Sequence, residues 1–234
     1  MSVPNMDMPT PIDPPLALVR LLQLASPALP VGAFGYSQGL EWAVEDGTVS
    51  NQASAQDWIE GILLHLQARL DVPILARMYD VWQTGDRSAI DRWNGILLAG
   101  RETRELREEE LHLGQALIKL LDGMQAIQAD YIPPKKSTFA AAFSLAAVQW
   151  NIPKAATVNG YLWAWLENQV LAAIKLVPLG QLAGQRMLFE LGERIPKVID
   201  RALEIEDSQI GAALPFLAIA SSRHESQYTR LFRS

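Results

Sequence analysis

Residues 154–177 read KAATVNGYLWAWLENQVLAAIKLV and lie between Pro153 and Pro178. When this stretch is wound as a helix, apolar side chains from Val158 to Ile174 occupy almost every face. A helix with so little polar surface is stable only when other elements cover it. The stretch therefore predicts a central buried helix in a helical protein.

The sequence on the N-terminal side of this helix shows the same periodicity. Trp58, Ile62, Leu66 and Leu70 recur every four residues, which is typical of a helix with one buried stripe. Ser54 followed by Asp57 is a capping signal for its start. We expect further helices to begin at Leu16, Asp71–Pro73, Ser88, Leu106 and Phe139, and after the central helix near Leu182, Val198 and Leu214.

No stretch alternates strictly between apolar and polar residues, as a half-buried strand does, so the sequence predicts an all-α single-domain protein. We expect a flexible proline-rich arm at residues 1–15, an all-helical domain at residues 16–221 and a C-terminal tail at residues 222–234. Residues 129–137, which contain Pro133 and Pro134, are the expected mid-chain loop.

Composition excludes several classes of protein. The 234 residues contain no cysteine, so disulfide scaffolds and cysteine-based metal sites are excluded, and a reducing compartment such as the cytoplasm is favoured. The net charge of -6 argues against a nucleic-acid partner, because there is no basic excess to bind phosphates. No apolar run reaches the roughly 18 residues of a membrane span, so we expect no membrane partner.

Gly35-Tyr36-Ser37-Gln38-Gly39 matches the G-x-S-x-G motif of serine hydrolases, and His224 follows it in the order that such enzymes require. The motif needs a buried strand before it, whereas the preceding residues are interrupted by Pro30 and Gly32. A glycine-rich loop that leads into a helix is the favoured interpretation. A hydrolase built on Ser37 and His224 is kept as the alternative function, and circular dichroism separates the two because a hydrolase needs a large sheet.

The sequence gives little support for a metal site or a nucleotide site. Glu109 and His112 form one Glu-x-x-His pair, whereas a di-metal bundle needs two such pairs and further glutamates. The run from Arg101 to Glu110 is predicted to be a solvated helix face, with Arg101 paired to Glu105. The chain has none of the common phosphate-binding glycine motifs. We therefore expect no metal and no cofactor.

The C-terminal tail has the composition of a binding segment. It contains three arginines, Arg223, Arg230 and Arg233, and two aromatic residues. Arginine and aromatic side chains are enriched in interface hot spots. If the tail is helical, Tyr228, Leu231 and Phe232 form one apolar edge. We expect the tail to be mobile in the free protein and ordered on a partner. The alternative is that the same side chains dock on the chain's own body, in which case truncation of the tail lowers thermal stability.

Two strings at the ends of the chain and two in the middle resemble those of one known family. They are SPALPVGAFGYSQGLEW at residues 26–42, TRELREEEL at 103–111, WLENQ at 165–169 and RHESQYTRLFRS at 223–234. In length, order and spacing they resemble the signatures of the UreF family of urease accessory proteins, with Ala33 and Gly35 as departures where glycine and serine are expected.

This resemblance implies an all-α protein of about ten helices that dimerises and has no enzymatic activity. It implies a scaffold that joins the accessory protein UreD, also called UreH, to the GTPase UreG, for GTP-dependent nickel insertion into apo-urease. That members of the family also regulate this GTPase is a hypothesis about the family. The residues expected to contact partners are Tyr36, Gln38, Glu41, Arg223, His224, Glu225, Gln227, Tyr228, Arg230, Leu231, Phe232 and Arg233.

Overall fold

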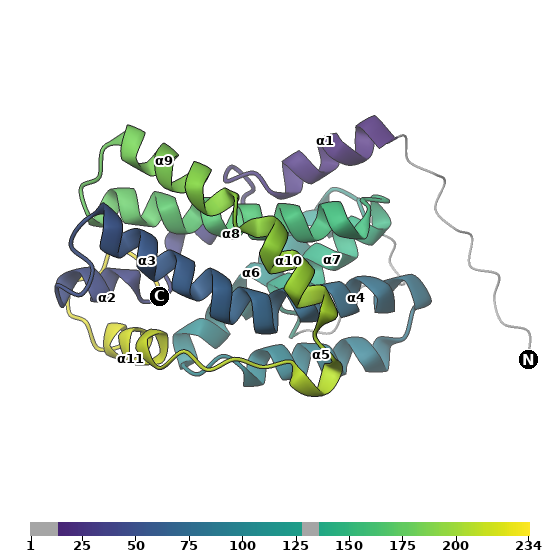
Figure 1. Cartoon of the computed structure of the whole chain (residues 1–234). Coiled ribbons are helices and arrows are strands. Elements are labelled where there is room, and N and C mark those ends of the chain that lie inside the picture. Colours follow the sequence, from purple (N-terminus) through teal and green to yellow (C-terminus); the bar gives the residue numbers. More distant parts are fainter. Residues whose placement is uncertain (1–13, 128–135) are drawn as a thin grey trace, which may run out of the picture.

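The computed structural model describes residues 14–127 and 136–234, and it contains helices, turns and loops but no strand within those residues (Figure 1). The prediction of an all-α single-domain fold is confirmed. The α-helices are α1 (Pro14–Leu24), α2 (Leu40–Glu45), α3 (Gln52–Ile62), α4 (Val72–Thr84), α5 (Arg87–Ala99), α6 (Arg104–Gly123), α7 (Phe139–Gln149), α8 (Lys154–Leu176), α9 (Gln181–Gly192), α10 (Ile195–Glu204) and α11 (Pro215–His224). Short 3-10 turns, η1 (Ala33–Gly35) and η4 (Asp207–Gln209), lie in two of the loops.

The predicted helix break at Asp71–Pro73 is wrong. A π-helix, η2 (Leu63–Asp71), joins α3 to α4 without interruption, and the backbone N–H of Val72 donates to the carbonyl of Gln67. Pro73 then falls in the first turn of α4, where a missing N–H is tolerated. The helical rod therefore passes through the proline by changing its hydrogen-bond register rather than by ending.

Two of the predicted helix starts are displaced by a few residues. Asn51, not Ser54, caps α3, and Ser54 completes a capping box with it. Asp86, not Ser88, caps α5 by accepting from the backbone N–H groups of Ser88 and Ala89. In both cases a serine inside the first turn contributes to the cap but does not begin the helix.

Helix α8 is central, as predicted, since it packs against α1, α2, α3, α4, α7, α9 and α10, but α7 is the more completely buried helix. Every residue of α7 from Ala140 to Ala147 is buried, and its alanines allow close approach of α4 and α6. The α6–α7 junction is so close that a Cβ on Gly114 would lie 2.1 Å from the carbonyl oxygen of Ser137. Helix α8 buries Leu162, Leu166 and Val170 but leaves Trp163 40% exposed, because no helix covers that side fully.

The ends of the chain are arranged differently from the prediction. Helix α1 begins at Pro14, so Pro14 and Pro15 start a helix instead of belonging to the arm. The remaining arm and most of the 129–137 loop lie outside the described residues. Helix α11 ends at His224, after which the chain folds back toward α2 (Figure 1). None of the described helices is long and apolar enough to cross a membrane.

Candidate functional site

The loop before α2 is the centre of the site. Gln38 and Gly39 have positive φ angles of 53° and 77°, and this turn directs the chain into α2. A Cβ on Gly39 would lie 3.0 Å from the backbone nitrogen of Ser221 in α11. The glycine therefore serves two needs, a left-handed backbone and the close approach of α11.

The C-terminal tail runs beside this loop and bonds to its backbone. The N–H of Arg233 donates to the carbonyl of Gly35 at 2.7 Å, and the N–H of Ser37 donates to the main-chain oxygen of Ser234 at 2.7 Å. The Ser37 hydroxyl donates to the same oxygen at 2.6 Å. The two strings from opposite ends of the sequence are thus one structural unit.

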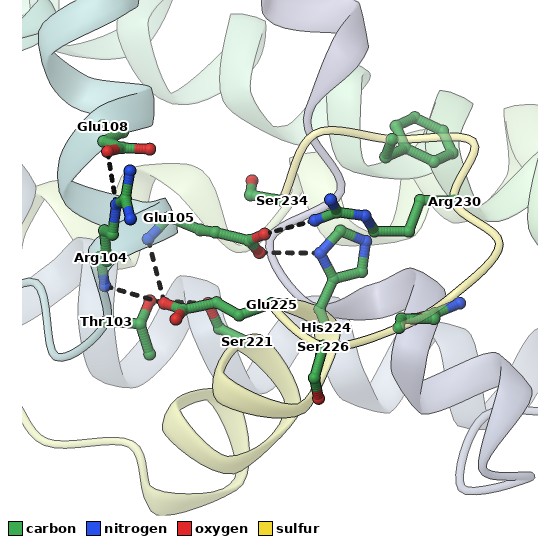
Figure 2. A network of polar contacts seen from close by, with 12 residues as sticks. Thr103, Arg104, Glu105, Glu108, Ser221, His224, Glu225, Ser226, Arg230 and Ser234 are labelled. Carbon is green, nitrogen blue, oxygen red and sulfur yellow. Dashed lines mark hydrogen bonds and ion pairs between the residues drawn. The ribbon is translucent and has the colours of Figure 1, made fainter.

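Glu41 and His224 hold the tail against the body of the domain. The Glu41 carboxylate accepts from the backbone N–H groups of Leu231 and Phe232 at 2.6 and 2.8 Å, and lies 3.2 Å from Nε2 of His224. The second ring nitrogen of His224, Nδ1, lies 2.7 Å from Glu105 (Figure 2). Glu105 also accepts from Arg230 at 2.8 Å. The fully buried imidazole therefore links α11 to α2 and α6.

Glu109 connects the loop, the tail and α8. It accepts from Gln38 Nε2 and from the Ser234 hydroxyl, each at 2.8 Å. Gln38 in turn accepts from the indole N–H of Trp165 at 2.9 Å. Burial raises the pKa of Glu109 from its ordinary 4.5 to about 7, although both hydrogen bonds lower it. This carboxyl group therefore titrates near neutral pH.

Two further groups complete the surroundings of the loop. The Asn168 side chain donates to the carbonyl of Tyr36 at 3.1 Å, and the Tyr36 hydroxyl lies 3.4 Å from Nδ1 of His112. Burial raises the pKa of Tyr36 above its ordinary range, and a hydrogen bond with Arg233 opposes that shift. All four of the strings that we singled out in the sequence thus meet at one place.

Glu225 closes the network at the start of α6. Its carboxylate accepts from the backbone N–H groups of Arg104 and Glu105 at 3.1 and 3.4 Å (Figure 2). A carboxylate at a helix N-terminus is stabilised by the helix dipole and satisfies donors that have no partner within the helix. The end of α11 is thereby fixed to the beginning of α6, and a 2.7 Å hydrogen bond between Thr103 and Ser221 reinforces the contact.

The geometry does not support the hydrolase alternative. The Ser37 hydroxyl donates to Ser234, whereas His224 contacts Glu41 and Glu105, so the two residues do not form a nucleophile and base pair. Both side chains are fully buried. Within residues 14–127 and 136–234, no group of three or more histidine, aspartate or glutamate side chains is placed to hold a metal ion.

The structure corrects the predicted conformation of the tail. The residues after His224 are not helical, so Tyr228, Leu231 and Phe232 do not form one edge. Phe232 is buried against the chain's own body, whereas Tyr228 and Leu231 are fully and 68% exposed. The expected mobile tail is an ordered segment here, because Glu41 and the 35–37 backbone satisfy its N–H and C=O groups.

The other predicted contact residues divide into two groups. Tyr36 and Glu41 are buried and Gln38 is half-buried, so they support the tail from within. Arg223, Glu225, Arg230 and Arg233 are exposed and Gln227 is half-buried. Of these, Glu225 still bonds to the start of α6 and Arg230 to Glu105.

Several residues of the site were missed or misassigned from the sequence. The run from Arg101 to Glu110 is not a solvated face, since Arg101, Glu109 and Glu110 are all buried. Arg101 precedes α6 and pairs with Asp71 and Glu110 instead of Glu105. The signal available in the sequence was the TRELREEEL string itself, which contains both Glu105 and Glu109.

Comparisons with known proteins identify the family of the chain. The UreF family model matches residues 49–192. Proteins named "Urease accessory protein UreF" are similar along nearly the whole chain. One from Alkalilimnicola ehrlichii is 48% identical over 228 residues, covering 97% of this chain and all of that protein. Another, from Pseudomonas putida strain W619, is 53% identical over 220 residues, covering 94% and 98% of the two chains. The chain belongs to the UreF family of urease accessory proteins, which are not enzymes.

Proposed function

We propose that this chain is a scaffold that bridges UreD (UreH) and the GTPase UreG in the cytoplasm, so that nickel is inserted into apo-urease in a GTP-dependent step. The observation that carries the proposal is the ordered tail, which presents exposed side chains on a firmly bonded support. Tyr228 and Leu231 are exposed. Between them in the sequence, Arg230 donates to Glu105, and the backbone N–H of Leu231 itself donates to Glu41. An exposed aromatic and aliphatic pair is suited to bury in a protein partner, and a backbone that is already bonded does not have to be ordered on binding.

The UreD-type protein is the partner we assign to this surface. Exposed apolar side chains rimmed by charged groups are typical of protein interfaces. Phe34 is 61% exposed and precedes Gly35, whose carbonyl holds Arg233, so it extends the same surface. We infer that this surface binds first and that UreG joins afterwards on a surface shared by two subunits.

Co-elution of the purified proteins tests the assignment. Tyr228→Ala and Leu231→Ala together should abolish co-elution with the UreD-type protein and activation of urease, while the helical circular dichroism stays unchanged. Leu203→Ala, on the half-exposed side of α10, is the control and should co-elute normally. If the double variant still forms the complex, the tail is not the binding surface.

We also propose that the scaffold is a homodimer, and that its contact surface is the groove between α1, α8 and α9. This groove has a volume of about 550 Å³, and Leu22, Trp163 and Phe189 line it with 40 to 73% of their surface exposed. Figure 1 shows α1 and α9 on the same side of α8, and residues of both helices line the groove. A second copy that buries these side chains would remove the largest exposed aromatic residue of α9 from water.

Nucleotide chemistry belongs to UreG in this proposal, because the chain has no phosphate-binding glycine motif. The isolated chain is expected to release no phosphate from GTP and to retain no stoichiometric nickel in equilibrium dialysis. GTP hydrolysis that persists after the chain is purified again, or one nickel ion held per monomer, would contradict the scaffold role. Adding the chain to UreG and UreD then shows whether it changes GTP turnover or only positions the GTPase.

A further inference from the structure

A small, partly open cavity lies beside the π-helix η2, next to the loop that supports the tail, since Gln38 and Glu109 are among its lining residues. Its volume is about 70 Å³, and its walls come from η2, α6, α8 and the loop after α1. Leu29, Phe34 and Trp165 contribute apolar wall, whereas Gln67, Asp71 and Arg101 contribute polar wall. One water molecule needs roughly 10 to 15 Å³ of such space, so the cavity can hold a molecule of a few heavy atoms.

The buried charges on the cavity wall do not balance. Arg101 donates to Asp71 at 3.1 Å and to Glu110 at 2.5 Å, so one guanidinium serves two carboxylates. Glu109 also lines the cavity, and all four side chains are less than 10% exposed. Among the described residues that line the cavity, Arg101 is the one cationic side chain. Burying an excess of negative charge is costly, and burial raises the pKa of both Glu109 and Glu110. Where these carboxyl groups are ionised, the site favours a positive charge in the cavity.

Gln67 provides an independent indication of a missing hydrogen-bond donor. Its side chain is 1% exposed and lines the cavity, and its Oε1 atom has no hydrogen-bond partner among the described residues. The π-helical register places Gln67 and Asp71 on the same cavity wall, four residues apart. Buried amide oxygens are nearly always hydrogen-bonded, so an acceptor left open toward a cavity indicates a donor that occupies it.

We propose that this cavity binds a small cation whose charge is carried on N–H groups, of the size of ammonium or methylammonium. Such an ion offers only donors, which suits an open amide oxygen and an excess of carboxylates. The methyl group of methylammonium suits the apolar wall, and the aromatic residues Phe34, Tyr161 and Trp165 also line the cavity. Aromatic rings attract cations. Water could satisfy Gln67 but would leave the charges unbalanced. This proposal does not depend on the bridging of UreD and UreG.

Thermal unfolding of the full chain at pH 8 tests the proposal. At this pH a proton on Glu109, whose pKa is about 7, no longer supplies the missing positive charge. Methylammonium chloride should raise the unfolding midpoint by several degrees in a saturable manner. Sodium chloride and tetramethylammonium chloride, at the same ionic strength, should not, because sodium ions have no N–H groups and tetramethylammonium has none and is too large.

Two variants assign the effect to the cavity. Gln67→Leu removes the open acceptor without adding charge, and should abolish most of the methylammonium effect. Gln169→Leu is the matched control: this glutamine is also fully buried with unpartnered amide atoms, but it does not line the cavity. The control should respond like the unchanged chain.

Saturation-transfer NMR on the unchanged chain keeps the test independent of how the variants fold. Magnetisation should pass from the protein to the methyl group of methylammonium, and added ammonium chloride should displace it. Equal midpoint shifts for all three salts, a full methylammonium effect in Gln67→Leu, or no saturation transfer would each overturn the proposal and leave water as the occupant.

Discussion

At the scale of single residues, Glu109 makes stability depend on pH. Its pKa is about 7 in the folded chain and ordinarily 4.5, so the folded state holds the proton more tightly than the unfolded chain does. The resulting stabilisation is complete below about pH 4.5 and is lost as the pH rises through 7. One pKa unit corresponds to roughly 1.4 kcal/mol, so the loss from this group is on the order of 3 to 4 kcal/mol.

Glu109→Gln should therefore flatten the pH dependence of unfolding between pH 5 and pH 8, and should be more stable than the unchanged chain at pH 8. Urea denaturation at the two pH values measures the difference. The comparison is made between the two proteins at each pH, so the contributions of other carboxyl groups cancel. Parallel pH profiles for the two proteins would show that Glu109 does not titrate in this range.

Gly39 is the second residue with a definite expected effect. A Cβ at this position would lie 3.0 and 3.1 Å from the Ser221 nitrogen and the Ala220 Cβ, and the φ angle is positive. Gly39→Ala should lower the free energy of unfolding by about 2 to 3 kcal/mol. Gly47→Ala is the control, because Gly47 has a similar φ of 83° with no atom within 4 Å of the added Cβ. Equal losses in the two variants would show that α11 does not constrain Gly39.

The residues of the site could be predicted from the sequence only in part. The strings identified the segments, but not that Gln38 bonds to Glu109 in α6 and to Trp165 in α8. Helical periodicity indicates which face of an isolated helix is apolar. It cannot indicate that a charged residue such as Glu109 is buried by partners from a loop 71 positions earlier.

At the scale of elements, the tail is a structural part of the domain. Phe232 is 6% exposed, and Lys175 Nζ lies 5.8 Å from the centre of its ring. Phe232→Ala should lower the free energy of unfolding by about 2 to 4 kcal/mol, because it removes a buried ring. Tyr228→Ala, on the same segment, should change it by less than about 0.5 kcal/mol, since Tyr228 makes no buried contact.

Chemical denaturation of both variants distinguishes a docked tail from a free one. If Phe232→Ala and Tyr228→Ala are equally stable, the tail does not rest on the body in the free protein, and the sequence-based expectation of a mobile segment is restored. Deletion of Gln227 to Ser234 should likewise destabilise the chain, because it removes Phe232 together with the Ser234 contacts to Ser37 and Glu109.

Two elements were predicted wrongly because their conformation departs from the local preference of the sequence. In the tail, helical spacing was assumed, but the N–H groups of Leu231 and Phe232 bond to a carboxylate on α2 instead of to carbonyls of their own turn. At Pro73, a helix end was assumed, but a π-helix shifts the hydrogen-bond register before it. Sequence patterns report local preference, and both outcomes were decided by tertiary contacts or by a rare local register.

At the scale of the whole molecule, the fold was the most predictable feature, because the 3.6-residue period recurs in nearly every segment and needs no knowledge of partners. It was less predictable which helix is buried most completely. The apolar composition of α8 predicted a central helix, and α8 does pack against most of the other helices, but it keeps Trp163 exposed beside Phe189 while α7 is buried more completely. An apolar residue that the fold leaves uncovered is a candidate for an interface between chains.

This surface gives the prediction for the assembly. Phe189 is 73% exposed and lines the α1–α8–α9 groove, so a charge placed there would have to be buried in a dimer without a partner. In light scattering after size exclusion, Phe189→Glu should have the monomer mass of 25.9 kDa, while the unchanged chain has about twice that mass.

Leu182→Glu, on the same helix and 65% exposed in the unchanged chain but outside the groove, is the control and should remain dimeric. Circular dichroism should be the same for all three proteins, because neither side chain contributes to the core of the monomer. A dimeric Phe189→Glu protein would place the subunit contact elsewhere, and a monomeric Leu182→Glu protein would extend the contact along α9 beyond the groove.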